Sequence, residues 1–437
     1  MKNTDVIIIG AGAAGLMAAY TLVQSGKTVK VLEARNRIGG RIHTITGQSF
    51  STPVELGAEF VHGDLPITLS LLHEAGIADC DVSFEMWQYH DGTFKQSEEF
   101  VEGWNGFLEK LNQLQDDMPI EDFLQQNFAG QEYAKMRSQI DNYVSGYDTA
   151  DVNDASTFAL RNEWNHEDED AQHRVKGGYI KMLQYLADTC TNAGSDILLN
   201  TTVKEIAWQK DAVKVITAND TIYKANKVII ALPLGVLHAT KEAEGAIQFN
   251  PPLQEHEDAI KGIGFGSIIK ILLEFDEIFW ESDAVTRSAG ADLSTMGFLF
   301  ADEEIPTYWT QAPEHSLLLT GWLGGPPAYD KKDLSPEAIL QLTLTSLSNI
   351  FKIDTEVLKN KLIVWKVANW TAEPYTRGSY AYDKVESPQA RKVLQQPVEQ
   401  TIYFAGEYLY DGPAMGTVEA ALTSGKSVVE KLLKTNI

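Results

Sequence analysis

Three glycines and one glutamate near the start of the chain have the types and spacing of nucleotide-binding residues. Gly10, Gly12 and Gly15 form the pattern G-x-G-x-x-G, and Glu33 follows at about the 20-residue distance at which an acidic side chain binds an adenosine ribose. In this pattern the first glycine permits a tight turn, the second lets the backbone approach a pyrophosphate, and the third lets a helix pack closely against a strand. The spacing therefore predicts a dinucleotide-binding site.

The elements that would position these residues occur in the expected order. Residues 6–9 are an apolar run typical of a strand buried in a parallel sheet, and the glycines follow directly. A helix over residues 13–25 would direct its first N–H groups at phosphates. A second strand over residues 28–32 would end at Glu33. The alternative is an ordinary βαβ unit that binds no nucleotide.

The N-terminal run has two further interpretations, a cleavable export signal and a membrane anchor. Lys2 precedes an apolar segment with small residues, as in an export signal, but Asp5 and the three glycines argue against one. A membrane span needs about 20 predominantly apolar residues, and the sequence contains no such stretch. We therefore expect a cytoplasmic protein with no membrane partner.

Composition limits the remaining classes. The chain has 437 residues, enough for two domains, and its hydrophobic fraction of 44% and charged fraction of 22% are typical of a globular protein. Cys80 and Cys190 are too few for a disulfide framework, and no metal-ligand spacing or Ser-His-Asp triad stands out. A formal charge of -25 disfavours nucleic acid as a partner and favours cationic ligands, although high acidity also serves solubility alone.

A longer pattern extends the nucleotide motif. Residues 33–41 read EARNRIGGR, which resembles the segment through which the flavin-containing amine oxidase superfamily binds FAD. Other segments similar to this superfamily follow in the same order, at residues 55–63, 231–237, 267–280, 370–380, 404–407 and 416–425. The resemblance covers nearly the whole chain and is weakest over residues 65–152. It is closest to polyamine oxidases and to the catalytic part of histone lysine demethylases. We expect neither a long helical insertion nor an N-terminal chromatin-binding module, so a chromatin role is not favoured.

This resemblance and the pattern of elements predict an α/β fold of two interleaved domains. A Rossmann-like FAD-binding domain is expected from the discontinuous residues 1–75, 175–258 and 370–437. An α+β substrate-binding domain is expected from residues 76–174 and 259–369. The acidic run at 165–170 is expected to be a solvated loop near a crossing between the domains.

The resemblance implies a role for each of several cofactor-binding residues. Glu33 would hold the adenosine ribose, the backbone of Val203 the adenine, Arg41 the pyrophosphate and Glu407 the ribityl chain. The helix that begins near Thr417 would face the pyrimidine end of the flavin. The full set of expected FAD-binding residues is Gly10, Gly12, Ala14, Gly15, Glu33, Ala34, Arg35, Gly40, Arg41, Gly57, Ala58, Glu59, Val203, Trp370, Tyr375, Gly406, Glu407, Gly416, Thr417 and Val418.

The resemblance also implies catalytic residues. Lys270 would reach the flavin N5 through a water molecule, although a lysine in an alternating strand can also face solvent. Ser379 stands where members with covalent flavin carry cysteine, so FAD is expected to be non-covalent. Thr417 stands where monoamine oxidases place a second tyrosine, which disfavours their substrate preference. The expected catalytic residues are Lys270, Tyr380, Trp370, His62 and Thr417.

Trp370, Tyr375 and Tyr380 are expected to form aromatic walls beside the flavin ring, and His62 and Glu59 are candidates to hold the distal part of a cationic amine. The reaction implied is hydride transfer from a polyamine or related amine to flavin N5. Imine hydrolysis and reduction of O2 to hydrogen peroxide would follow.

Three alternatives to a polyamine oxidase stay open. One is an L-amino-acid oxidase that holds its substrate carboxylate with Arg161, Arg174 or Arg377. Another is a monoamine oxidase. The third is a flavin-binding protein without turnover. The sequence leaves the oligomeric state open.

Overall fold

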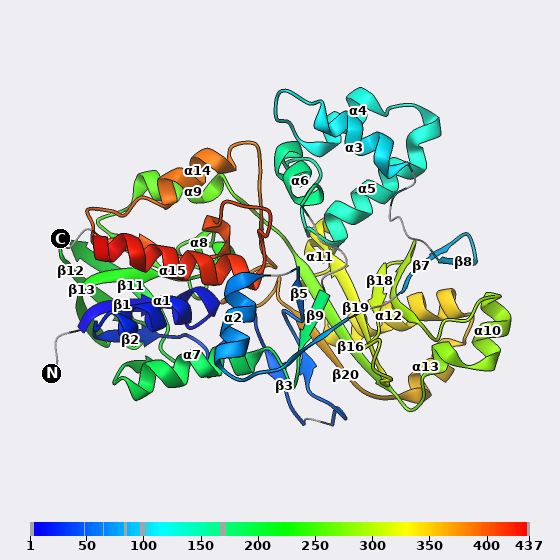
Figure 1. Ribbon diagram of the computed structural model, residues 1–437, viewed down its shortest axis with the longest axis horizontal. Coiled ribbons are helices and arrows are strands. Elements are labelled where there is room, and N and C mark those ends of the chain that lie inside the picture. The colour runs from blue at the N-terminus through cyan, green and yellow to red at the C-terminus, as the bar shows by residue number, and fades with distance from the viewer. Residues whose placement is uncertain are drawn as a thin grey trace.

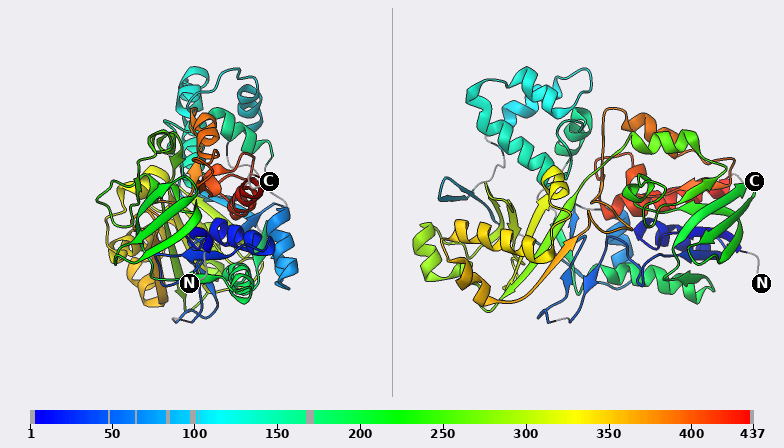
Figure 2. Two further views of the ribbon diagram at one scale, coloured as in Figure 1. Left: turned by 90° about the vertical axis from the view of Figure 1, so that its left-hand side faces the viewer. Right: turned by 180° about the vertical axis from the view of Figure 1, so that it is seen from behind.

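The computed structural model describes residues 4–434 except 48, 64, 83–84, 97–100, 102 and 167–171 (Figure 1). Two large sheets lie at opposite ends of the molecule, and a lobe of helices lies beside the region between them (Figure 1 and Figure 2). Most of the acidic run at 165–170 falls outside the described residues. Among the residues that are described, no helix combines the length and the apolar character needed to cross a bilayer.

The first sheet carries the predicted nucleotide motif. It has eight strands in the order β10-β2-β1-β13-β12-β11-β14, and β22 also pairs with β13. Neighbouring β10, β2, β1, β13 and β22 are parallel, as in a Rossmann-like sheet. The strands are β1 (Thr4–Ile9), β2 (Val29–Leu32), β10 (Asp196–Leu198), β11 (Val203–Gln209), β12 (Ala212–Thr217), β13 (Ile222–Ile230), β14 (Gln248–Asn250) and β22 (Ile402–Phe404).

Strand β1 is buried on both faces of this sheet. Val6 and Ile8 belong to the apolar cluster on one face, whereas Ile7 and Ile9 belong to the cluster on the other. The first cluster packs against α1 (Ala13–Gln24), α7 (Ile180–Asn192) and α15 (Val418–Lys434). The continuous apolar run in the sequence therefore reflects a parallel sheet covered on both sides.

Close packing explains two of the glycines. A Cβ atom at Gly15 would lie 2.0 Å from the carbonyl oxygen of Gly10, so the turn and α1 fit together only without a side chain at this position. Gly10 itself has φ +103°, a conformation that other residues rarely adopt. These contacts agree with the prediction of a tight strand-to-helix turn.

The second sheet supplies the opposite wall of the site. Its seven strands follow the order β20-β16-β19-β18-β17-β7-β8, and α12 (Pro336–Phe351) and α13 (Thr355–Lys361) pack on it. Every residue of β16 is buried, so the alternative of a solvent-facing Lys270 is wrong. The strands are β7 (Glu85–His90), β8 (Thr93–Gln96), β16 (Ile268–Phe275), β17 (Met296–Ala301), β18 (Thr307–Trp309), β19 (Leu318–Gly324) and β20 (Leu362–Asn369).

The helical lobe, coloured cyan to green in Figure 1, has an apolar core of its own. It comprises α3 (Trp104–Asn112), α4 (Ile120–Asn127), α5 (Ala134–Gly146) and α6 (Thr157–Trp164). A small three-stranded sheet joins β5 (Phe60–His62) to β6 (Asp79–Asp81) and β9 (Gln172–Val175). This sheet pairs segments from both expected domains, whose boundaries stay a prediction. The α/β fold class is confirmed.

Candidate active site

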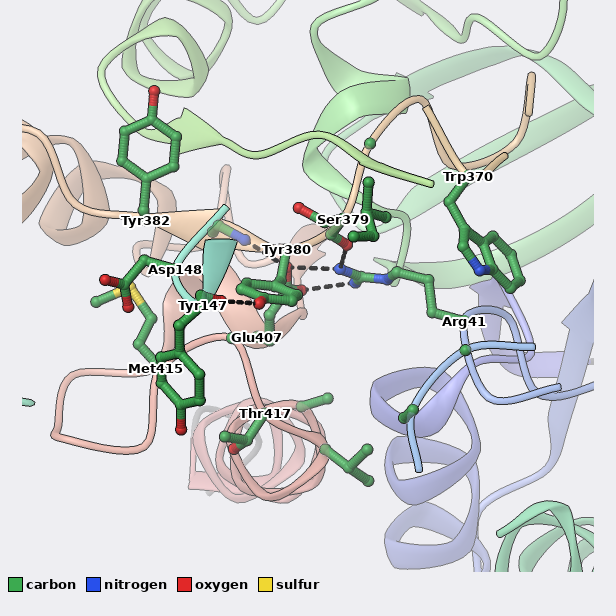
Figure 3. Close-up of a pocket in the computed structure, with 18 of the residues that line it drawn as sticks. Arg41, Tyr147, Asp148, Trp370, Ser379, Tyr380, Tyr382, Glu407, Met415 and Thr417 are labelled. Carbon is green, nitrogen blue, oxygen red and sulfur yellow. Dashed lines mark hydrogen bonds and ion pairs between the residues drawn. The ribbon is translucent and has the colours of Figure 1, made fainter. Parts of the chain in front are cut away.

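A single large cavity of about 1000 Å³ runs between the two sheets and beneath the helical lobe. Gly12, Glu33 and Val203 line one end, and Lys270 and Trp309 line another part. Figure 3 shows Tyr380 in the middle of its drawn part, with Arg41 and Trp370 on one side and Tyr147 and Asp148 on the other. The cavity therefore brings together residues from the whole length of the chain.

The glycine turn leaves room for a ligand at the N-terminus of α1. Gly12 is the residue at the start of this helix, and it has no side chain with which to cap the first N–H groups. A Cβ atom at Gly12 would meet no neighbouring protein atom nearer than 4.0 Å, so the backbone opens into the cavity. Unpaired N–H groups at a helix N-terminus favour an anion. The turn thus fits a cofactor pyrophosphate.

Glu33 is fixed at the end of β2. Its Oε2 accepts a hydrogen bond from the backbone N–H of Ala11 at 2.8 Å, and its Oε1 accepts one from Arg35 N at 2.9 Å. The residue is only 4% exposed, yet it lines the cavity. A carboxylate held in this way can accept hydrogen bonds from ribose hydroxyls. The geometry fits the adenosine role that the sequence assigned to Glu33.

Arg41 and Glu407 form a bidentate ion pair in the cavity wall. Arg41 Nη1 and Nη2 donate to Glu407 Oε1 and Oε2 at 2.9 and 2.8 Å, and Nη1 also donates to the carbonyl oxygen of Ser379 at 2.7 Å (Figure 3). Burial opposes ionisation of Glu407, but the charge of Arg41 holds its pKa below the usual range. The sequence assigned these residues to different parts of FAD without indicating that they pair.

Lys270 points into a buried cluster of charges. Its ammonium donates to Glu59 Oε2 at 2.8 Å and to the carbonyl oxygen of Gly57 at 3.2 Å, and it lies 5.1 Å from the centre of the Trp309 ring. Glu59 also accepts hydrogen bonds from Arg174 and Gln311. Glu59 therefore already accepts hydrogen bonds from several protein donors, and its contact with a substrate amine stays a prediction.

The aromatic residues divide between two regions. Trp370 is held by a hydrogen bond of 2.7 Å from its Nε1 to the carbonyl oxygen of Leu56, and the Tyr380 hydroxyl donates to the carbonyl oxygen of Tyr147. Tyr375, expected beside them, contacts other groups. Its ring lies 5.6 Å from the Arg35 guanidinium, and its hydroxyl bonds to Glu244. Arg35 neighbours Glu33, so these contacts place Tyr375 toward the adenosine end.

Two other expected catalytic residues have clear structural partners. Thr417 caps α15: its Oγ1 accepts from Ala420 N at 3.2 Å and donates to Ala414 O at 2.7 Å. His62 Nδ1 lies 2.6 Å from Gln172 Oε1. Both Thr417 and His62 also line the cavity. The remaining expected FAD-binding residues that line it are Gly10, Ala14, Ala34, Gly40, Ala58, Gly406, Gly416 and Val418.

Gly15 is the one expected cofactor residue outside the lining, because it packs against Gly10. The arginines proposed to clamp an amino-acid carboxylate are also outside it. Arg161 binds carbonyl oxygens within the helical lobe, Arg174 binds Glu59, and Arg377 binds the carbonyl oxygen of Glu244. None of the three is placed to receive a carboxylate in the cavity.

Several lining residues were not predicted from the sequence. Tyr147 and Asp148 follow α5, in the stretch where the resemblance is weakest, and Glu163 belongs to α6. Trp309 and Trp322 come from β18 and β19. A single sequence carries no signal that joins these distant positions, because the cavity forms only when the lobe packs against both sheets.

Glu55 supports the segment that leads to Gly57 and Glu59. Its carboxylate accepts hydrogen bonds from Tyr179 N at 2.7 Å and Thr44 Oγ1 at 2.9 Å, and burial raises its pKa from 4.5 to about 7. As the pH rises from about 4.5 to 7, the unfolded chain therefore loses this proton while the folded protein keeps it. The free energy of unfolding falls over that window.

We expect Glu55→Gln to remove this loss, because a neutral amide keeps an acceptor oxygen without a buried charge. The melting temperatures of variant and wild type should nearly agree at pH 5, and the variant should melt higher at pH 8. Thermal unfolding monitored by circular dichroism across this range checks the prediction. If the melting temperatures of variant and wild type differ by the same amount from pH 5 to pH 8, Glu55 does not retain its proton.

Comparison with known proteins assigns the chain to a protein family. The family model described as flavin containing amine oxidoreductase matches residues 13–433, so the chain belongs to that family. The predictions of the amine oxidase family, of an oxidoreductase class and of a flavin cofactor are thereby confirmed. The glycine turn and Glu33 fit the FAD form of that cofactor.

The names of individual relatives indicate different activities. The chain is 30% identical to human lysine-specific histone demethylase 2 over 443 residues, which is 93% of this chain but 50% of that protein. It is 29% identical to polyamine oxidase 4 of Oryza sativa subsp. japonica over 465 residues, or 98% of this chain and 88% of that protein. The chain thus spans about half the length of the human demethylase and most of the plant oxidase.

Solved structures share the fold at low sequence identity. Putrescine oxidase bound to putrescine matches with a TM-score of 0.79 at 22% identity, over 99% of each chain. Cyclohexylamine oxidase from Brevibacterium oxydans IH-35A matches with a TM-score of 0.81 at 18% identity, again over 99% of each chain. These likenesses support the fold assignment.

Proposed function

We propose that the protein is an FAD-dependent oxidase of a polyamine or a related diamine. It would oxidise a C–N bond, and the resulting imine would hydrolyse while O2 is reduced to hydrogen peroxide. The observation that carries this proposal is one continuous cavity with a nucleotide-binding turn at one end and an acidic, aromatic region elsewhere. The similarity to proteins named polyamine oxidase supports the choice of substrate.

The charge of the cavity favours a cationic substrate. Among the described residues its lining has eight carboxylates and five lysines or arginines. The carboxylates are Glu33, Glu59, Asp148, Glu163, Asp302, Asp383, Glu407 and Asp411, and the cations are Arg35, Arg41, Lys135, Lys270 and Arg391. An excess of negative charge in a cleft attracts cations and repels carboxylates. This balance supports an amine substrate over an amino acid.

Four of these cations are also neutralised by neighbouring carboxylates. Arg41 pairs with Glu407 and Lys270 pairs with Glu59. Arg391 bonds to Asp383, and Arg35 bonds to Glu373, which lies outside the cavity lining. Asp148 and Glu163 both lie close enough to Tyr380 to raise the pKa of its phenol, after burial itself. We assign the distal ammonium of the substrate to this region near Tyr380.

The aromatic walls help to prepare the reacting amine. An amine loses its nitrogen lone pair when protonated, so it must be neutral to react. Trp309, Trp370 and Tyr380 present apolar surface that disfavours a charged amine and lowers its pKa. Bound FAD supplies the hydride acceptor at N5. The N-terminus of α15, capped by Thr417, would stabilise negative charge on the flavin ring.

A panel of substrates tests the proposal directly. We expect hydrogen peroxide release in air with spermidine, spermine or putrescine, and little with amino acids. A preference for amino acids would select the L-amino-acid oxidase alternative, and a preference for aromatic monoamines would select the monoamine oxidase alternative. A yellow protein that oxidises no amine would indicate a flavoprotein without turnover.

Asp148→Asn and Glu163→Gln test the placement of the distal ammonium. Each change removes one negative charge near Tyr380. We expect KM for a diamine to rise about tenfold, because one charge-assisted contact with the substrate is lost. KM for a monoamine of equal length should change little because it has no second ammonium. Steady-state kinetics with the matched amine pair measures this difference, and equal changes for both amines would contradict the assignment.

A further inference from the structure

Lys270 belongs to a buried group of three charged side chains, together with Glu59 and Arg174. Glu59 is 9% exposed and lies between two cations, with Lys270 Nζ 2.8 Å from Oε2 and Arg174 Nε 3.2 Å from Oε1. Trp309 Nε1 donates to Oε2 at 3.1 Å, and Gln311 Nε2 donates to Oε1 at 3.1 Å. Each carboxylate oxygen therefore has one cationic and one neutral donor.

The two cations occupy different sides of this carboxylate. Lys270, Glu59 and Trp309 line the cavity, whereas Arg174 and Gln311 do not. Arg174 is further anchored by hydrogen bonds to the carbonyl oxygens of Thr310 at 2.9 Å and Ala312 at 3.0 Å. Arg174 thus fixes Glu59 from behind, while Lys270 faces the cavity.

The ammonium of Lys270 has three N–H donors. In the described part of the chain, Glu59 and the carbonyl oxygen of Gly57 accept two of them. The third is left for a water molecule or another small molecule in the cavity. A buried ion pair is a weak source of net stability compared with apolar packing, so stability alone is a poor explanation for three charges at the cavity wall.

The charge of Glu59 is fixed by its neighbours. Burial alone would raise the pKa of Glu59, but the charges of Lys270 and Arg174 lower it to about 2. The carboxylate therefore stays ionised at any physiological pH. Without that negative charge, Lys270 and Arg174 would be two buried cations with no carboxylate between them.

We propose that Glu59 is a positioning residue that holds the ammonium of Lys270 in place and directed into the cavity during reoxidation of the flavin by O2. In that step two electrons pass from reduced FAD to O2, and with two protons they give oxidised FAD and hydrogen peroxide. A fixed ammonium beside the cavity stabilises the negative charge that develops on oxygen. The inference rests on the proposed oxidase function and deepens it.

The first experiment follows flavin reoxidation in Glu59→Gln. The holoprotein is reduced with dithionite and mixed with oxygenated buffer, so no amine substrate is needed. An amide cannot form the ion pair that holds Lys270, so we expect reoxidation in Glu59→Gln to be slower than in the wild type by about tenfold or more. A rate equal to that of the wild type would overturn the inference.

Glu274→Gln is a matched control. Glu274 lies on the same strand as Lys270, is 3% exposed, and accepts hydrogen bonds from Ser51 N rather than from a lysine. It does not line the cavity. We expect this variant to keep the wild-type rate of reoxidation. A loss of rate equal to that of Glu59→Gln would mean that removal of any buried carboxylate slows reoxidation, and the specific role of Glu59 would be wrong.

A double-mutant cycle separates positioning from a general structural effect. If Glu59 acts through Lys270, then Glu59→Gln should slow reoxidation no further in a protein that already carries Lys270→Met. If the losses of rate from the two changes multiply in the double variant, Glu59 does not act through Lys270. The melting temperatures of the same holoproteins give a readout independent of turnover, and the decreases from the two single changes should not add. Additive decreases would show that the two side chains do not interact.

Arg174→Gln provides the test if Glu59→Gln does not fold. Loss of the guanidinium removes the group that fixes Glu59 from behind, so Glu59 should hold Lys270 less firmly and reoxidation should slow. An unchanged rate would overturn the inference. Failure of the proposed function is distinguishable from either result, because it appears as a wild-type flavin that no amine reduces.

Discussion

Replacing Glu407 with alanine is expected to lower the free energy of unfolding by about 3 kcal/mol and to weaken FAD binding. The change leaves Arg41 in the cavity wall without the carboxylate that binds both of its terminal nitrogens. It also removes the acceptor for the backbone N–H of Ala381 at 3.2 Å. Urea unfolding of the protein without FAD and a titration with FAD measure the two effects separately.

Glu373→Ala is the matched control for this prediction. Glu373 also pairs with an arginine of the same N-terminal segment, Arg35, but its side chain is 29% exposed compared with 2% for Glu407. Pairs that reach solvent contribute about 1 kcal/mol or less. We therefore expect a clearly smaller loss of stability in Glu373→Ala. Equal losses in the two variants would contradict the importance that we give to burial of the Arg41–Glu407 pair.

Lys270→Met is expected to slow reoxidation of the reduced flavin about 100-fold, the typical cost of removing one preorganised electrostatic donor. The fold should persist because Glu59 keeps Arg174, Trp309 and Gln311 as donors. Stopped-flow absorbance after mixing reduced protein with O2 measures the rate. Unchanged rates of both flavin reduction and reoxidation would show that Lys270 has no catalytic role.

A buried lysine elsewhere provides the control. Lys227 lies on β13, is 9% exposed, and donates to the carbonyl oxygen of Gln400, but it does not line the cavity. Lys227→Met removes a buried cation and should reduce stability without changing the rate of reoxidation. A similar slowing in both variants would indicate that the rate responds to general damage rather than to the position of Lys270.

The nucleotide end of the site was predictable because its determinants are local. Gly10, Gly12, Gly15 and Glu33 lie within one βαβ unit, and their spacing dictates the turn, the helix start and the strand end. The helix expected over 13–25 ends one residue earlier, and the strand expected over 28–32 begins one residue later. These small differences leave the site unchanged.

The charge pairs were not predictable because their partners are far apart in the sequence. Arg41 and Glu407 matched separate motifs, and Glu59 was assigned to the cofactor and the substrate rather than to Lys270 and Arg174. Resemblance assigns a role to a position but does not reveal a partner that another segment contributes. Tyr375 illustrates the same limit, since Arg35 and Glu244 determine where its ring lies.

Anaerobic mixing of the FAD-loaded protein with spermidine, putrescine, an aromatic monoamine and an amino acid tests the central claim most directly. The visible absorbance of the oxidised flavin reports electron transfer from each compound. The proposed function predicts rapid bleaching by the polyamine or the diamine, and recovery of the yellow colour with release of hydrogen peroxide when air is admitted. Persistent yellow colour with every amine, in a protein that binds FAD tightly, would contradict an amine oxidase.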